Sequence, residues 1–245
     1  MRVFAIGDIH GEIDKLKALH EQIARFGGAD ARIIHVGDLL DRGPDSRAVV
    51  DYLREGLAKG RDWIVLKGNH DRFLPNFLYE PDWIDPGLSS GAHWVDHEGL
   101  GAAATLASYG VSAGQERAAL HEQALKAVPA DHAQWLDHLP LYHEEPGALF
   151  VHAGIRPGIA IEDQREQDLL WIRQGFLDNV EDHGRLVVHG HTPVKEVQHL
   201  GNRLAIDTGA VFGGKLSAVA LDDKGVSLLG EDGFAPLLPA MRVQA

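Results

Sequence analysis

The sequence predicts an α/β protein in which an N-terminal parallel βαβαβ unit is followed by a second, mixed sheet. Three short runs of bulky apolar residues, at 3–6, 33–36 and 63–66, have the pattern of buried strands. Between them, apolar residues recur at helical spacing over 12–26 and around 49–57. Strands that alternate with helices join a parallel sheet through right-handed crossovers, so the three strands should be neighbours.

The two N-terminal helices have recognisable faces and ends. Apolar residues three or four positions apart form the face of the first helix, namely Ile13, Leu16, Leu19, Ile23 and Phe26. The corresponding positions of the second helix are Val49, Val50, Leu53 and Leu57. Gly27-Gly28 should end the first helix and Lys59-Gly60 the second. Each helix should therefore pack one face against the sheet.

Residues 73–145 interrupt this alternation. An aromatic segment is punctuated by several glycines and by three prolines, Pro75, Pro81 and Pro86. Helical patterns then follow at 120–128 and 135–139. We expect a cap-like helical and loop insert within a single domain that covers 1–245. The sequence favours neither a substrate contact nor a purely structural role for this insert.

The C-terminal part of the chain returns to short strands. The expected strands are 148–151, 186–188, 204–206, 216–221 and 226–229. A turn at 222–225 makes the last two an antiparallel hairpin. A helix should include 169–172 and carry Arg173. The change from βα units to hairpins suggests a second, mixed sheet packed on the first.

Composition and charge exclude several classes of function. The 245 residues have a formal net charge of −13 and include no cysteine. The negative charge disfavours binding to nucleic acid or anionic membranes, which depends on Lys and Arg. Without cysteine, the chain has no disulfides, cysteine zinc sites or cysteine nucleophile. The first strand leaves no room for a signal peptide, and no apolar run approaches the ~20 residues of a membrane span, so we expect a soluble, cytoplasmic protein. The sequence does not specify the oligomeric state.

Polar clusters follow the predicted strands at the point where each strand ends. They contain Asp8 and His10, then Asp38, Asp41 and Arg42, then Asn69, His70 and Asp71, then His152, and finally His191. Because ligands bind outside the carboxyl ends of strands in open α/β sheets, the clusters should converge. Several carboxylates in a buried place need cations, since an isolated charge out of water is costly. Carboxylate, amide and imidazole ligands together suit manganese, iron or zinc.

Asp38 has two carboxylate oxygens and can bridge two ions. A pair of metals ~3.5–4 Å apart can clamp both the attacking and the leaving oxygen of an in-line phosphoryl transfer. Such a pair also lowers the pKa of a shared water towards neutrality. The residues therefore indicate phosphoester chemistry.

Five motifs, in order, resemble the signature of the calcineurin-like metallophosphoesterases. They are Gly7-Asp8-Ile9-His10-Gly11, Gly37-Asp38-Leu39-Leu40-Asp41-Arg42-Gly43, Gly68-Asn69-His70-Asp71, His152-Ala153-Gly154 and Gly190-His191. More narrowly, the set is similar to the phosphoprotein phosphatase family in its bacterial and phage lambda-phosphatase-like branch. The resemblance implies two mixed sheets that form a sandwich flanked by helices, a four-layer αββα fold.

The resemblance also implies a dinuclear metal centre. One metal would be held by Asp8 and His10, and Asp38 would bridge the two ions. The ligands of the other metal would be Asn69, His152 and His191. Mn²⁺ is the expected ion, with iron or zinc as alternatives.

The same resemblance implies the remaining catalytic roles. Arg42 and Arg173 would bind phosphate oxygens, although the motif around Arg173 resembles only the phage-like branch. His70 would be the general acid, oriented by Asp41, which agrees with the need of a leaving alkoxide for a proton. A metal-bridging hydroxide would attack phosphorus directly, without a phosphoenzyme.

Three functions compete. A phosphomonoesterase of the serine/threonine protein phosphatase type comes first, with a phosphoprotein or a small phosphoester as substrate. A symmetrical dinucleoside tetraphosphate hydrolase is the alternative; members of that group usually have Ala in place of Asp41 and a longer C-terminal region. A non-catalytic metal-binding scaffold is the third, and the presence of His70, Asp41 and Arg42 argues against it. Asp71 stands where protein-directed members usually have Glu.

Several other polar or aromatic residues are weaker candidates. His35 lies within a predicted strand and should be a packed, hydrogen-bonded histidine. His189 precedes Gly190 and should not bind metal. The turn at 207–209 should lie near the site, with Phe212 as a candidate contact. Four further histidines should be solvated, with the first two able to face substrate, namely His93, His97, His138 and His143.

Overall fold

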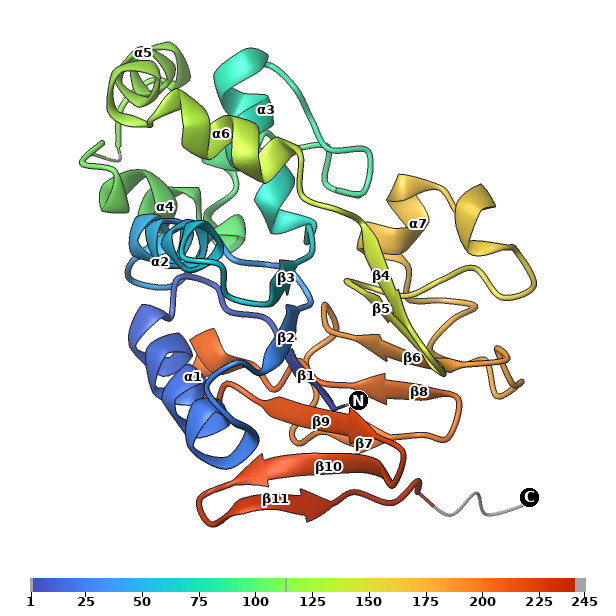
Figure 1. Cartoon of the computed structure of the whole chain (residues 1–245). Coiled ribbons are helices and arrows are strands. Elements are labelled where there is room, and N and C mark those ends of the chain that lie inside the picture. Colours follow the sequence, from blue (N-terminus) through green and yellow to red (C-terminus); the bar gives the residue numbers. More distant parts are fainter. Residues whose placement is uncertain (1, 113, 241–245) are drawn as a thin grey trace.

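The computed structural model describes residues 2–112 and 114–240 and contains two β-sheets packed face to face (Figure 1). The six-stranded sheet has the order β11-β10-β9-β1-β2-β3, and the five-stranded sheet has the order β4-β5-β6-β8-β7. Both sheets contain parallel and antiparallel pairs. The predicted two-sheet α/β fold is confirmed.

The first sheet is built on the predicted βαβαβ unit. Its parallel strands are β1 (Val3–Ile6), β2 (Arg32–His35) and β3 (Trp63–Val65), with β1 paired to β2 and β2 to β3. The other neighbour of β1 is β9 (Ala218–Asp222), which runs antiparallel to it and continues into β10 (Gly225–Gly230) and β11 (Gly233–Pro236). The C-terminal hairpin thus joins the first sheet, whereas the sequence had suggested that it belongs to the second.

The second sheet has a parallel centre and antiparallel edges. Its strands are β4 (Tyr142–Glu145), β5 (Ala148–Val151), β6 (Leu186–His189), β7 (Gln198–His199) and β8 (Arg203–Ala205). β5, β6 and β8 are parallel, while β4 and β7 pair antiparallel at the edges. The sequence analysis missed both edge strands because they lack an apolar run: β4 is Tyr-His-Glu-Glu and β7 is Gln-His.

Alternating side chains divide the interior into layers. Val3 and Ala5 of β1 face Phe150 and Val188 across the space between the sheets. Phe4 and Ile6, the intervening residues of β1, face the helices on the other side. This period of two is expected for strands covered on both faces. It gives one core between the sheets and one on each outer face.

Helices cover the outer face of each sheet (Figure 1). The first sheet is covered by α1 (Ile13–Gly27) and α2 (Ser46–Ala58), close to their predicted bounds. Asp45 caps α2, because its side chain accepts a hydrogen bond from the Ala48 amide at 2.9 Å. The second sheet is covered by α7 (Glu166–Trp171), whose Leu169 packs with Leu149 and Val187. These layers confirm the αββα arrangement.

The described residues of the predicted insert, 73–112 and 114–145, form four α-helices. They are α3 (Phe73–Tyr79), α4 (Ala102–Ser108), α5 (Arg117–Ala127) and α6 (Ala130–Asp137). Pro75 does not break α3 because it lies in the first turn, where its missing N–H has no intrahelical partner. Leu106, Leu120 and Leu136 share one hydrophobic core with α1 and α2. The helical part ends before β4, so 142–145 belong to the second sheet.

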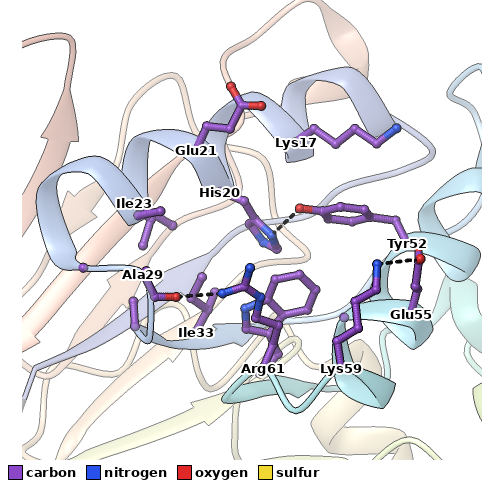
Figure 2. A pocket seen from close by; sticks show the side chains of 15 residues that line it. Lys17, His20, Glu21, Ile23, Ala29, Ile33, Tyr52, Glu55, Lys59 and Arg61 are labelled. Atoms are coloured by element: carbon purple, nitrogen blue, oxygen red, sulfur yellow. Dashed lines mark hydrogen bonds and ion pairs between the residues drawn. The ribbon is translucent and has the colours of Figure 1, made fainter.

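A groove of about 360 Å³ lies between α1 and α2. Figure 2 shows His20 and Tyr52 among the side chains that line it. His35 Nδ1 donates to the Ile64 carbonyl at 3.1 Å, so the neutral ring accepts at Nε2 from His20, 2.9 Å away. The Tyr52 hydroxyl then donates to His20 Nδ1 at 3.1 Å. Burial lowers the pKa of His35 to about 4 and that of His20 to about 2. His35 is therefore the packed, hydrogen-bonded histidine that the sequence predicts.

Within 2–112 and 114–240, no helix combines the length and the apolar character that a bilayer crossing requires.

Candidate dinuclear metal centre

The predicted ligand side chains converge at the carboxyl ends of five strands. Asp8 and His10 follow β1, Asp38 follows β2, Asn69 follows β3, and His152 and His191 follow β5 and β6. All six residues are at most 6% exposed. There are two groups of candidate ligands, and within each group the ligand atoms lie within 4.8 Å of one another. The first group is His10, Asp38 and His70, and the second is Asp38, His152 and His191.

Asp38 is the residue that the two sets share. Its Oδ2 lies 3.4 Å from His10 Nε2, and its Oδ1 lies 3.3 Å from His152 Nε2. The backbone amide of His70 donates to Oδ1 at 2.9 Å and so fixes the carboxylate plane. One oxygen therefore faces each group of imidazoles, which is the geometry that a bridging ligand needs.

Backbone carbonyls orient two of the histidines. His10 Nδ1 donates to the Leu40 carbonyl at 2.7 Å, and His152 Nδ1 donates to the Val36 carbonyl at 2.9 Å. In a neutral imidazole, a proton on Nδ1 leaves a lone pair on Nε2. Both Nε2 atoms point at Asp38. Metal-binding histidines are commonly held in this way through their second ring nitrogen.

Several polar atoms in the cluster lack a partner, and a cation would supply one. Asp8 Oδ1 and His191 Nε2 are buried and make no hydrogen bond to any described residue. Asn69 Oδ1 lies 2.9 Å from His152 Nε2, so two lone pairs face each other. Buried polar groups without partners are costly, and metal ions relieve this cost in carboxylate and imidazole clusters. The residues therefore fit a pair of divalent ions.

Burial keeps the imidazoles of the cluster neutral, as metal ligands must be, but it opposes the ionisation of Asp8. Burial lowers the pKa of His10 to about 3 and lowers the pKa values of His152 and His191 as well, so the imidazoles are neutral ligands. Burial, together with the carboxylates of Asp207 and Asp38, raises the pKa of Asp8 well above its usual value. Ionised Asp8 therefore needs a nearby positive charge.

The turns that present these residues have an unusual backbone. Among the described residues, the non-glycine residues with a positive φ are His10, Asp38, Asp41, Arg42 and His191, with φ between 45° and 72°. All five belong to the predicted site. Non-glycine residues adopt this region at a cost, and such strain clusters at functional sites.

His70 and Asp41 form a buried pair beside the ligands. His70 Nδ1 lies 2.7 Å from Asp41 Oδ2, and the His70 ring meets the His10 ring edge to face at 4.9 Å. Asp41 also accepts hydrogen bonds from Trp94 Nε1 at 3.0 Å and from Thr105 Oγ1 at 2.7 Å. The sequence analysis missed Trp94 and Thr105, because a lone Trp or Thr in an irregular segment carries no local signal.

Arg42 and Arg173 line a cavity of about 120 Å³ next to His10 and His191. Arg42 is half-buried, and its Nη1 donates to His10 Nε2 at 2.9 Å. Arg173 is exposed and lies two residues beyond the end of α7, in a loop. The sequence-based prediction that a helix carries Arg173 is therefore wrong. Both guanidinium groups face a space of the size of a phosphate group.

Asp207 is a further buried carboxylate on the same cavity. It follows β8, and the sequence analysis treated 207–209 only as a turn near the site. Burial raises the pKa of Asp207 to about 6, with a smaller contribution from Asp38. Its place directly after a strand was the signal that could have identified it.

The remaining histidines lie outside the cluster. His189 is buried against Phe176, with ring centroids 5.1 Å apart, and its Nδ1 donates to the Gly190 carbonyl. His138 is exposed, as predicted. His93, His97 and His143 are half-buried, and so are less solvated than the sequence suggests.

The fold and the cluster match known proteins. A family model described as calcineurin-like phosphoesterase matches residues 1–229. The chain belongs to the calcineurin-like phosphoesterase family. It is 27% identical to bis(5'-nucleosyl)-tetraphosphatase PrpE [asymmetrical] of Bacillus mycoides (strain KBAB4), over 89% of this chain and 90% of the relative. It is 28% identical to the protein of the same name from Bacillus thuringiensis subsp. konkukian, with the same coverage.

Solved structures share the fold of this phosphoesterase. One, described provisionally as a diadenosine tetraphosphatase, has a TM-score of 0.63 and 22% identity, and covers 92% of this chain and 91% of that one. A cold-active protein-tyrosine phosphatase from a psychrophilic Shewanella has a TM-score of 0.61 and 15% identity, and the match covers 93% of this chain and 77% of that one. A protein serine/threonine phosphatase from Saccharomyces cerevisiae has a TM-score of 0.57 and 14% identity, and the match covers 92% of this chain and 78% of that one.

Proposed function

We propose that this calcineurin-like phosphoesterase hydrolyses dinucleoside polyphosphates with the help of two divalent metal ions. The observation that carries the proposal is the carboxylate of Asp38, which is shared between two groups of histidines and lies beside two arginines. The relatives named bis(5'-nucleosyl)-tetraphosphatase, matched over nine-tenths of their length, support this substrate class. The proposal therefore follows the alternative that the sequence placed second, and the relatives favour asymmetrical over symmetrical cleavage.

Each ligand role is part of this proposal. Asp8 and His10 would hold one ion, and Asp38 would be a ligand of both ions. The other ion is held by Asn69, His152 and His191. When bound, the ions neutralise phosphate charge and lower the pKa of a water molecule so that it can attack phosphorus. We infer Mn²⁺ from the mixture of oxygen and nitrogen ligands, with iron or zinc as alternatives.

The protein's own side chains bind the phosphate chain and move a proton. Arg42 and Arg173 face the small cavity and bind the non-bridging oxygens, where charge builds up in the transition state. His70 donates a hydrogen bond from Nδ1 to Asp41, and a second proton on Nε2 would be transferred to the departing oxygen. The buried position of this pair keeps water from competing for the hydrogen bond.

A phosphomonoesterase of the protein phosphatase type is the second candidate. The Asp41–His70 pair favours it, because a serine or threonine alkoxide is a poorer leaving group than a nucleotide phosphate and needs a general acid more. The relatives' names weigh against this function as the main one. We retain the cytoplasmic location as a prediction.

A direct comparison of substrates tests the proposal. Protein that has been stripped of metal and reloaded with Mn²⁺ is incubated with diadenosine tetraphosphate, a phosphoserine peptide and p-nitrophenyl phosphate. We expect the tetraphosphate to be hydrolysed with the highest kcat/KM, to AMP and ATP, and a chelator to abolish turnover. Asp38→Asn protein, prepared identically, controls for contaminating activity. Rapid turnover of the phosphopeptide without cleavage of the tetraphosphate would establish the second candidate instead.

A further inference from the structure

Phe212 is an exposed aromatic residue at the rim of the proposed active site. Its side chain is 66% exposed, yet it lines the cavity that contains Arg42 and Arg173. Scattered exposed apolar residues are normal on protein surfaces and need no explanation. Other large apolar residues with comparable exposure, such as Tyr79 and Val180, line no part of this cavity.

The loop that carries Phe212 is a tight turn stabilised by hydrogen bonds. Phe212 ends a 3₁₀ turn, Ala210–Phe212, which is flanked by Gly209 and Gly213 with φ values of 65° and 90°. Glycine permits this left-handed backbone on both sides of the turn. Asp207 accepts a hydrogen bond from the Gly209 amide at 2.9 Å, within the same loop.

A lysine ties this loop to α1. Lys15 Nζ donates to the Ala210 carbonyl at 2.6 Å and to the Gly214 carbonyl at 3.4 Å. Thr208 Oγ1 closes the base of the loop by donating to the Lys215 carbonyl at 2.6 Å. An aromatic ring on a preorganised loop loses little entropy when it binds a flat ligand.

The ring of Phe212 lies next to a phosphate-binding group. The Arg42 guanidinium carbon is 5.6 Å from the centre of the Phe212 ring, within the range of a cation–π contact. The same guanidinium reaches His10 in the ligand cluster. A substrate phosphate bound to Arg42 would therefore have an aromatic surface one side chain away.

The size of the cavity separates phosphate from nucleoside. About 120 Å³ accommodates a phosphate group, whereas pockets that enclose a drug-sized molecule measure about 300–1,000 Å³. A nucleoside attached to the bound phosphate must therefore lie outside the cavity, along its rim. Phe212 offers a flat apolar surface at that rim, in contact with water until a ligand covers it.

We propose that Phe212 is a stacking platform for a nucleobase of the dinucleoside polyphosphate. This inference deepens the proposed function and rests on it, because it gives the active site a base subsite as well as a phosphate subsite. Any nucleobase can stack on an aromatic ring, since every base has a π-face. A purine offers more stacking area than a pyrimidine. The platform thus favours nucleotides over phosphoesters that lack a base.

A comparison of ligands with and without a base tests the platform. ATP and inorganic tripolyphosphate are measured as inhibitors of p-nitrophenyl phosphate hydrolysis, using the Mn²⁺-loaded protein. Phe212→Ala should raise the inhibition constant of ATP about 5- to 150-fold, the range of one base–aromatic stack. The constant for tripolyphosphate should change less than 2-fold, and Phe212→Trp should keep ATP binding near that of the parent.

The control is Tyr79→Ala, which removes a similarly exposed aromatic ring from the end of α3 and should leave both constants unchanged. Equal weakening of ATP and tripolyphosphate in Phe212→Ala, or no weakening of either, would overturn the platform. Because the readout compares two inhibitors, it stays informative even if diadenosine tetraphosphate is not a substrate. Failure of the platform and failure of the proposed function are therefore distinguishable.

Discussion

The carboxylate of Asp41 shows how much of the site depends on residues far away in sequence. It accepts hydrogen bonds from His70, Trp94 and Thr105, and the last two come from the segment between β3 and β4. The backbone amide of Asp41 also donates to Thr105 Oγ1 at 2.9 Å. Buried carboxylates with several donors hold a fixed orientation. The helical insert therefore supports the proposed general acid.

Replacement of His70 by Asn tests its role in proton transfer. We expect kcat to fall by about 10²- to 10⁴-fold, since Asn cannot donate a proton to the departing oxygen. The content of bound Mn²⁺, measured by elemental analysis, should stay close to that of the parent because His70 is not among the proposed ligands. A variant as fast as the parent removes His70 from catalysis, and a variant that has lost one metal makes it a ligand.

Asp207→Asn tests the free-energy cost of burying the carboxylate that lines the cavity. Because the pKa of Asp207 is raised from 3.8 to about 6, its stabilising protonated form is fully present below pH 4 and is lost as the pH rises through 6. In metal-free protein at pH 7.5, Asp207→Asn should therefore be more stable than the parent by about 2–3 kcal/mol, at ~1.4 kcal/mol per pKa unit. Urea unfolding at pH 4 and pH 7.5 measures this. A difference that is equal at both pH values contradicts the raised pKa.

At the scale of elements, the loops after β2 and β3 are joined by one carboxylate. Asp71 Oδ1 accepts from the amides of Leu39 and Leu40 at 2.8 and 3.2 Å, and Oδ2 accepts from the Gly68 amide at 2.8 Å. These contacts fix the chain directly after Asp38 and directly before Asn69. Asp71 thus sets the distance between two proposed ligands, although it is not itself among the proposed ligands.

Asp71→Asn should therefore weaken metal binding. In Asp71→Asn, an NH₂ group takes the place of one carboxylate oxygen that accepts from backbone N–H groups. Two donors then face each other, so the loop after β2 must shift. We expect the affinity for Mn²⁺ to fall by about 10- to 100-fold, as for other groups that orient metal ligands. Calorimetric titration of the metal-free protein measures this affinity, and Asp71→Glu, which keeps the charge, is the matched variant. Unchanged affinity in Asp71→Asn would show that the loops hold their positions without it.

The sequence predicts some of these elements far better than others. The ends of β1 and β5 fall where their apolar runs end, because buried strands are uniformly apolar and end at a polar cluster. β4 escapes prediction because an edge strand with one solvated face has no such run. Trp94 and Thr105 escape it because only the tertiary fold brings them to Asp41. The sequence thus predicts the motifs that follow the strands, but not the residues that hydrogen-bond to them from distant parts of the chain.

At the scale of the whole molecule, the proposed metal pair joins two sheets. Asp8, His10, Asp38 and Asn69 follow strands of the six-stranded sheet, whereas His152 and His191 follow strands of the five-stranded sheet. A ligand that binds only the folded state stabilises it by mass action. Metal binding should therefore hold the carboxyl edges of both sheets together, and the excess of negative charge on the chain favours cation uptake.

A crystal structure of the Mn²⁺-loaded protein, with the ions located by anomalous scattering, tests whether Asp38 is shared by two metal ions. We predict two peaks about 3.5–4 Å apart, one on each side of the Asp38 carboxylate. One should contact Asp8 and His10, and the other Asn69, His152 and His191. A single peak, or two peaks that do not share Asp38, would contradict the account.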